Sequence, residues 1–215
     1  MAADRPDAIE TPQTVDAGHF QVETSVASYT KDAANSYSFL STMLKAGLLR
    51  WCDLELSLEP FLYETGRGRF GDWTPRFKAN FWGNDGGRFA AGSIVFAAMP
   101  AKEGGIIFPF AYDLSEKWGL AFQTELDIVA NAAATGHDLD FINLAGVTYG
   151  LTESLSVFSE FFSQISREGN PWAGRVDVGA TYRITDNFSM DGAVYIGITE
   201  AAEDFNPFVG FSWRY

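Results

Sequence analysis

Residues 172–184 read WAGRVDVGATYRI, and residues 188–199 read FSMDGAVYIGIT. In the first stretch apolar residues such as Val176 and Val178 alternate with charged or small residues, and the second stretch alternates in the same way. A period of two is typical of a β-strand with one apolar face. Residues 185–187 are polar and short enough for a tight turn. The two stretches therefore predict a β-hairpin.

The same hairpin unit recurs along the whole chain. Short polar turns follow one another about every 31 to 37 residues, a period that indicates a repeated supersecondary unit. Longer polar or glycine-rich links separate them, at residues 31–36, 64–72, 100–105, 131–137, 166–171 and 200–204. Short turns at one end and longer loops at the other are typical of transmembrane β-barrels.

The repeat predicts an all-β fold: a transmembrane antiparallel up-and-down β-barrel with short periplasmic turns and longer extracellular loops. We expect twelve strands, at residues 19–30, 37–49, 53–64, 73–83, 88–99, 105–114, 118–130, 138–151, 155–165, 172–184, 188–199 and 205–215. Most reach the length of about 9 to 11 residues that a tilted strand needs to cross a bilayer. The even number places both ends of the barrel on the periplasmic side. The barrel then occupies residues 18–215.

Residues 1–17 precede the first expected strand and do not alternate. They form either a periplasmic tail or a lumen-inserted segment, in which Arg5 would face acidic side chains of the wall. Met1 directly before Ala2, Ala3 and Asp4 resembles a start codon placed on a mature protein, so we expect that a leader has been removed.

The composition excludes several classes of protein. Hydrophobic residues make up 47% of the 215 residues, yet no stretch approaches the roughly 18 apolar residues of a membrane helix. A net charge of −13 argues against nucleic acid as a partner, because no basic patch is available for phosphates. Cys52 is the only cysteine, so we expect no internal disulfide, no metal site and no cofactor.

A soluble β-sandwich or lipocalin-like barrel is the alternative fold. In the expected strand 53–64 the outward residues would be Leu54, Leu56, Leu58, Pro60 and Leu62, opposed by Asp53, Glu55, Ser57, Glu59, Phe61 and Tyr63. Twelve such strands carry more apolar face than one core can use, and lipid covers the excess on a closed barrel. Alternation is poor around Ser93 and Asn143, where we expect β-bulges.

Aromatic residues lie beside the short turns, where amphipathic rings favour the level of the lipid headgroups. The predicted membrane girdle is Trp51, Phe81, Tyr112, Trp118, Tyr149, Tyr182, Phe188 and Trp213. In the final strand Val209, Phe211, Trp213 and Tyr215 would face lipid, and Arg214 would face the lumen at the periplasmic mouth. The terminal aromatic residue resembles the signal by which the barrel-assembly machinery recognises outer-membrane proteins.

The chain resembles the outer-membrane transporter family described as "MetA-pathway of phenol degradation". The residues that carry the resemblance are 5–7, 10, 12, 15, 18, 21–23, 56–60, 81–87, 110–114, 149–155 and 206–213. Residues 48–52 depart from it, because the family has a more polar turn there. The resemblance implies an outer-membrane channel for the passive passage of small solutes, including aromatic or other small organic compounds. Outer-membrane lipid and a small-molecule solute are then the expected partners.

If apolar residues face lipid, the alternate positions line the lumen. The predicted pore-lining residues are Glu23, Lys45, Glu55, Glu59, Arg76, Lys78, Asn80, Gln123, Glu125, Asp127, Glu160, Arg175, Asp177, Arg183, Asp191 and Arg214. We expect cross-strand pairs of Glu55 or Glu59 with Arg76 or Lys78. Arg175, Asp177 and Asp191 would pair likewise on the opposite wall. Two readings remain open: a conducting pore, or salt bridges that fill a barrel without a pore.

Catalysis is the less favoured function. An outer-membrane lipase needs a serine and histidine pair, and the two histidines are His19 and His137. His137 lies in an expected loop beside Asp138 and Asp140, with no identifiable nucleophile. We therefore expect no enzyme. A non-conducting structural or adhesion barrel is the other alternative.

Overall fold

The computed structural model describes residues 3–32, 34–64, 66–131, 135–167 and 171–215. Parts of four of the expected links, 31–36, 64–72, 131–137 and 166–171, lie outside the described residues, as do Met1 and Ala2 of the N-terminal segment. The strands are β1 (Phe20–Thr30), β2 (Ser36–Leu49), β3 (Cys52–Leu58), β4 (Phe61–Glu64), β5 (Arg67–Arg69), β6 (Trp73–Trp82), β7 (Phe89–Ala98), β8 (Glu103–Asp113), β9 (Trp118–Ala130), β10 (His137–Gly150), β11 (Leu155–Ser166), β12 (Ala173–Thr185), β13 (Phe188–Gly197) and β14 (Phe205–Arg214).

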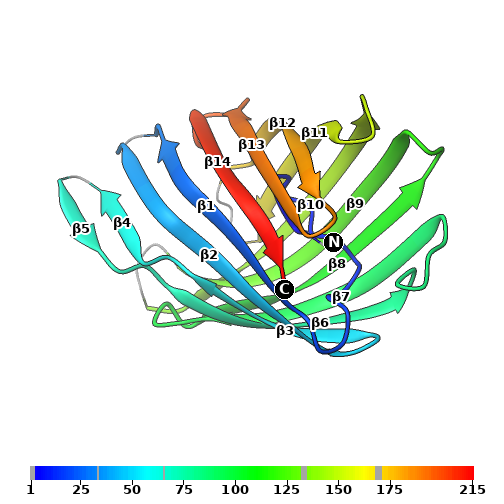
Figure 1. Ribbon diagram of the computed structural model, residues 1–215. Helices are drawn as coiled ribbons and strands as arrows, with labels where there is room; N and C mark the ends of the chain where they lie inside the picture. Colours follow the sequence, from blue (N-terminus) through cyan, green and yellow to red (C-terminus); the bar gives the residue numbers. More distant parts are fainter. Residues whose placement is uncertain (1–2, 33, 65, 132–134, 168–170) are drawn as a thin grey trace.

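Twelve of these strands close into a ring, which confirms the predicted barrel. Each strand pairs antiparallel with its neighbour in the chain, β3 pairs with β6, and β1 pairs with both β2 and β14 (Figure 1). At the seam, the N–H of Tyr215 donates to the carbonyl of Phe20 at 2.8 Å, and the N–H of Phe20 donates to the carbonyl of Tyr215 at 3.0 Å. The seam leaves no free edge in the ring, as a bilayer requires.

The strand predicted at 53–64 is broken at Glu59 and Pro60. Pro60 has no N–H to donate, so the ladder is interrupted there and the following residues change face. Phe61 and Tyr63 are 58% and 46% exposed, whereas Leu62 lies opposite Ser38, which lines an internal cavity. The prediction that Leu62 faces lipid and that Phe61 and Tyr63 face the lumen was therefore wrong.

Beyond this break β4 and β5 form a small hairpin, where a longer polar or glycine-rich link was expected at 64–72. Strand β5 pairs with β4 alone. The hairpin projects past the rim of the barrel (Figure 1).

The bulge predicted near Ser93 is confirmed, because the register of the β6–β7 pair shifts between Asn80 and Trp82, opposite Gly92 and Ala91. The bulge predicted near Asn143 was wrong, because the register of β10 against β9 and β11 runs without a shift across that residue. Alternation is poor in β10 for another reason: its inward residues Ile142 and Leu144 are apolar.

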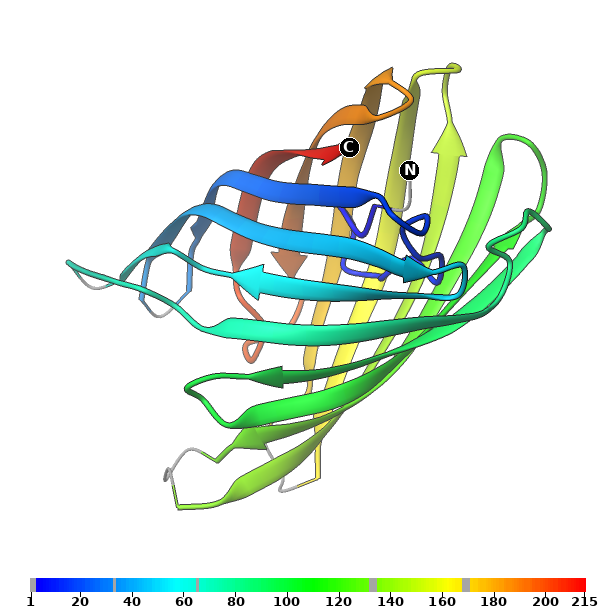
Figure 2. The same cartoon turned by 60° about the horizontal axis from the view of Figure 1, so that its bottom comes forward.

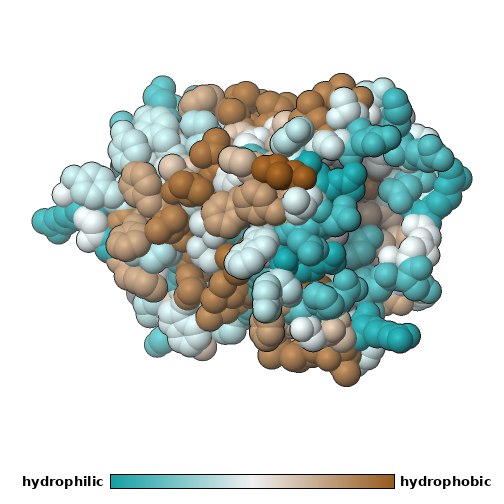
Figure 3. All heavy atoms as spheres, viewed as in Figure 1, coloured by the Kyte–Doolittle hydropathy of each residue, from teal (hydrophilic) through white to brown (hydrophobic). Residues whose placement is uncertain are grey.

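The outer face of the barrel is apolar. Figure 3 shows apolar side chains gathered over the wall formed by β1, β2 and β14. Six of the eight predicted girdle residues are exposed on this outer surface: Trp51, Phe81, Tyr112, Trp118, Tyr182 and Trp213. Tyr149 stacks on Trp118 with ring centroids 4.5 Å apart, and Phe188 packs near Phe211 at 5.9 Å.

No helix among the described residues is long and apolar enough to cross a membrane.

Candidate functional site: the lumen and the segment inside it

Residues 4–16, which we call the lumen segment, run inside the barrel in front of the inner wall (Figure 2). The segment forms no helix or strand, so its N–H groups need other partners. Wall side chains supply them. Glu160 of β11 accepts from the N–H groups of Ala8 at 2.8 Å and Ile9 at 3.2 Å, and Gln123 of β9 accepts from Glu10 at 2.8 Å.

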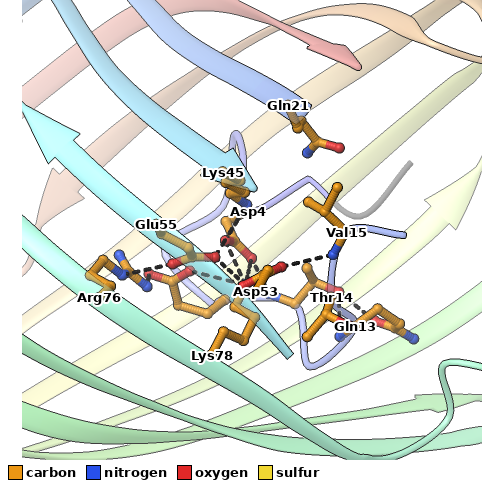
Figure 4. Close-up of polar contacts among 12 residues, drawn as sticks. Asp4, Gln13, Thr14, Val15, Gln21, Lys45, Asp53, Glu55, Arg76 and Lys78 are labelled. Atoms are coloured by element: carbon orange, nitrogen blue, oxygen red, sulfur yellow. Dashed lines mark hydrogen bonds and ion pairs between the residues drawn. The ribbon is translucent and has the colours of Figure 1, made fainter. Parts of the chain in front are cut away.

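A buried charge network joins the start of the segment to strands β2, β3 and β6 (Figure 4). The Asp4 carboxylate contacts the ammonium groups of Lys45 and Lys78, the latter at 2.7 Å. The Glu55 carboxylate lies 3.2 Å from Lys78 Nζ and 2.9 Å from Arg76 Nε. Because these groups are withdrawn from water, each charge depends on its partners for stabilisation.

Further ion pairs hold the segment at other points of the ring. Arg5 donates to Asp191 on β13 at 2.7 Å and to Ser25 on β1 at 2.5 Å. Glu10 accepts from Arg76 on β6 at 2.5 Å.

Neutral hydrogen bonds fix the rest of the segment. Tyr195 on β13 donates to the Pro6 carbonyl at 2.9 Å, and Val15 donates to Asp53 on β3 at 2.7 Å. These contacts and the ion pairs together reach walls on opposite sides of the barrel.

The wall also contacts the lumen segment through apolar packing and through a close approach of the two backbones. Ile9 is buried against Ile142 and Leu144, the inward apolar residues of β10. At Gly47 an added Cβ would lie 2.1 Å from the carbonyl oxygen of Asp16, so only glycine allows the backbones to approach this closely.

The wall ion pairs predicted from sequence fall into three groups. Glu55 contacts both Arg76 and Lys78, and Arg175 lies 2.9 Å from Asp177. Asp191 instead pairs with Arg5, which belongs to the lumen segment. Glu59 is exposed beside the break after β3, with no ion pair among the described residues.

The remaining predicted pore-lining residues lie at different heights on the wall. Asn80 donates to the Pro12 carbonyl at 2.8 Å, and Glu23 accepts from the N–H of Asp4 at 3.0 Å. Arg183 and Arg214 lie at the short-turn end: Arg183 donates to the Glu153 carbonyl at 2.6 Å, and Arg214 contacts Asp16 at 3.0 Å. Glu125 and Asp127 occupy β9 on the loop side of Gln123, which the lumen segment contacts.

Sequence reasoning missed two parts of this site. Asp4 and Glu10 were not assigned a role, because no local pattern connects them to β2 or β6. Asp140 fell within the expected strand 138–151 but was not counted among the pore-lining residues, although it faces Asp127 across the β9–β10 ladder. The alternation of Asp138 and Asp140 with Leu139 and Phe141 is a signal that could have placed Asp140 on the inner face.

A cavity of about 280 Å³ remains between the lumen segment and the wall of β1, β2, β13 and β14. Its walls include four serines, the carboxylates of Asp7 and Glu59, and the ring of Tyr195.

The candidate catalytic histidine lies apart from this cavity. His137 begins β10 and is exposed, with Nε2 3.0 Å from the Lys102 carbonyl oxygen. Among the described residues, no group of three or more His, Cys, Asp or Glu side chains is arranged to hold a metal ion.

A closed antiparallel ring with an apolar exterior and a charged interior defines an outer-membrane β-barrel. The family model described as "MetA-pathway of phenol degradation" matches residues 3–215, and the chain belongs to this family. A search of curated proteins gave no match.

Solved structures with a similar fold are outer-membrane porins and channels. The NanC porin is 9% identical, with a TM-score of 0.65 over 90% of this chain and 98% of that one. The KdgM porin is 7% identical, with a TM-score of 0.62 over 90% and 98%. An outer membrane channel from Pseudomonas putida F1 is 12% identical, with a TM-score of 0.63 over 94% and 97%. At these identities the likeness concerns the fold.

Proposed function

We propose that the chain is a channel of the Gram-negative outer membrane through which small solutes diffuse passively, and that the lumen segment restricts the pathway. One observation carries this proposal: residues 4–16 are bound by side chains on opposite walls, from Asp53 and Lys78 on one side to Glu160 and Asp191 on the other. A segment anchored in this way narrows the route between the loop end and the short-turn end.

The family description supports small organic compounds, including aromatic ones, as the solutes. Outer-membrane lipid is the proposed partner of the apolar exterior. The proposed partner of β14 and of Tyr215, which follows it, is the barrel-assembly machinery.

The test is to reconstitute the purified protein. We expect discrete conductance steps in planar bilayers, and swelling of liposomes in a panel of sugars, organic acids and small aromatic compounds. Folding is checked by the heat-dependent shift in gel mobility that intact barrels give. A folded protein with neither steps nor swelling would contradict the proposal and favour a non-conducting barrel, whose buried salt bridges serve stability alone.

The docking of the lumen segment is expected to depend on pH through Asp7, which precedes β1. Burial raises the pKa of the Asp7 carboxyl from 3.8 to about 7; the negative charges of Asp4, Glu23 and Asp191 also raise it, and a backbone hydrogen bond partly offsets the effect. The docked state therefore holds a proton that the released segment loses. Docking is fully favoured below pH 3.8 and is progressively weakened up to about pH 7.

We accordingly expect conductance to rise from about pH 4 to about pH 7 and to level off above that. In Asp7→Asn this rise should be much smaller, because the amide does not titrate. Equal pH profiles for the wild type and Asp7→Asn would contradict the assignment to Asp7.

A further inference from the structure

The two lysines buried inside the barrel are already neutralised by acids. Lys45 contacts Asp4 and Glu23, and Lys78 contacts Asp4 and Glu55. None of these groups retains an uncompensated positive charge for a solute.

The two inner arginines nearest the loop end are occupied as well. Arg76 is held by Glu10 and Glu55. Arg175 pairs with Asp177, and its guanidinium carbon lies 4.2 Å from the ring centroid of Phe162 and 4.3 Å from that of Tyr195. The charge of Arg175 is therefore already compensated by Asp177 and by the faces of the two rings.

Acidic side chains on the opposite wall lack such partners. Asp127 on β9 faces Asp140 on β10 in the ladder, and no lysine or arginine among the described residues forms an ion pair with either. Asp140 is only 4% exposed, and its Oδ2 accepts from Gln164 at 2.6 Å. The Oδ1 atoms of both aspartates are buried and have no hydrogen-bond partner in the described residues. Like charges directly opposite each other repel, so a positive charge between them is favoured.

These aspartates lie where a solute from outside would pass first. Strand β9 runs from Trp118 at a short turn to Ala130 near the loop end. Gln123 binds the lumen segment, and Glu125 and Asp127 follow it toward the loop end on the same face. The acidic wall therefore lies on the extracellular side of the lumen segment.

We infer that this channel selects against anions and admits cationic and neutral solutes, with Asp127 and Asp140 as its main selectivity-determining residues. The inference rests on the proposed channel function and adds the class of solute that the channel admits. Fixed charges of one sign lining a low-dielectric pathway raise the local concentration of the opposite ion and set channel selectivity. Protonated amines and neutral small organic molecules fit this lining, whereas carboxylates and sulfonates do not.

The first measurement is the reversal potential in a KCl gradient. We expect wild-type channels to prefer K⁺ over Cl⁻. In Asp127→Asn/Asp140→Asn the ratio of K⁺ to Cl⁻ permeability should fall about threefold for each kT by which the substitutions weaken the negative electrostatic potential in the pathway. The control Glu116→Gln/Asp186→Asn removes two acids from exposed short turns and should leave the ratio unchanged. If the double variant does not fold, Asp127→Asn alone provides the comparison.

The second measurement is liposome swelling with three solutes of similar size: glucosamine, glucose and glucuronate. We expect entry in that order, with the difference between glucosamine and glucuronate reduced in the double variant. Preference for Cl⁻, or an unchanged ratio in folded Asp127→Asn/Asp140→Asn, would overturn the inference while leaving the channel intact. Absence of both conductance and swelling in folded wild type would overturn the proposed function and this inference with it.

Discussion

Deletion of residues 2–16 is expected to give the largest functional change: a higher single-channel conductance with longer open times. The deleted chain retains all of β1, which begins at Phe20, so the ring can still close through its pairs with β2 and β14. The deletion removes the ion pairs of Asp4 and Glu10 with the wall. The freed wall charges, such as Lys78, gain water in the opened lumen, which limits the cost of losing these partners.

Conductance in planar bilayers measures this effect directly. A synthetic peptide of residues 2–16 provides the control, since millimolar peptide approaches the effective concentration of a tethered segment and should lower the conductance again. An unchanged current after deletion would show that the segment does not restrict the pathway.

Lys78→Met is expected to give the largest loss of stability from a single substitution. Lys78 is 0% exposed, with Nζ 2.7 Å from Asp4 Oδ2 and 3.2 Å from Glu55 Oε1. Methionine preserves much of the volume but leaves two buried carboxylates with one cation fewer. Breaking a buried pair in this way costs about 3–5 kcal/mol. Urea unfolding of the reconstituted barrel measures the loss.

Lys31→Met is the matched control. Lys31 is 58% exposed and lies 3.6 Å from Asp204, and surface pairs of this kind contribute about 0–1 kcal/mol. Adding Asp4→Asn to Lys78→Met should recover part of the stability, because it removes one of the unpaired acids. Equal unfolding free energies for Lys78→Met and Lys31→Met would contradict the role assigned to the buried network.

The fold was predictable because the alternation of apolar and polar residues within each strand shows which of its faces is apolar. The alternation in 172–184 and 188–199 predicts a hairpin, and its repetition predicts the number of strands that the ring contains. The prediction was wrong at Phe61 and Tyr63, because a single proline break reverses the faces and alternation alone cannot detect the reversal.

The inward direction of residues such as Glu55 and Arg175 also followed from the alternation. Their partners followed only in part. Glu55 and Arg76 are cross-strand neighbours, so their pairing could be anticipated from adjacent strands, whereas Asp191 was expected to pair with the wall and instead contacts Arg5.

The residue pattern alone is enough to predict an antiparallel barrel with an apolar exterior and a charged interior, because side-chain direction in a strand is a local property with a period of two. The partners of the interior charges depend instead on how the closed barrel folds. Asp4 meets Lys78 across 74 residues, and Arg5 meets Asp191 across 186, because closing the ring brings distant strands around one segment. Those contacts occupy Arg5 and Lys78, and no lysine or arginine among the described residues forms an ion pair with Asp127 or Asp140. The repeating pattern that predicts the wall therefore carries no information about which of its charges remain free.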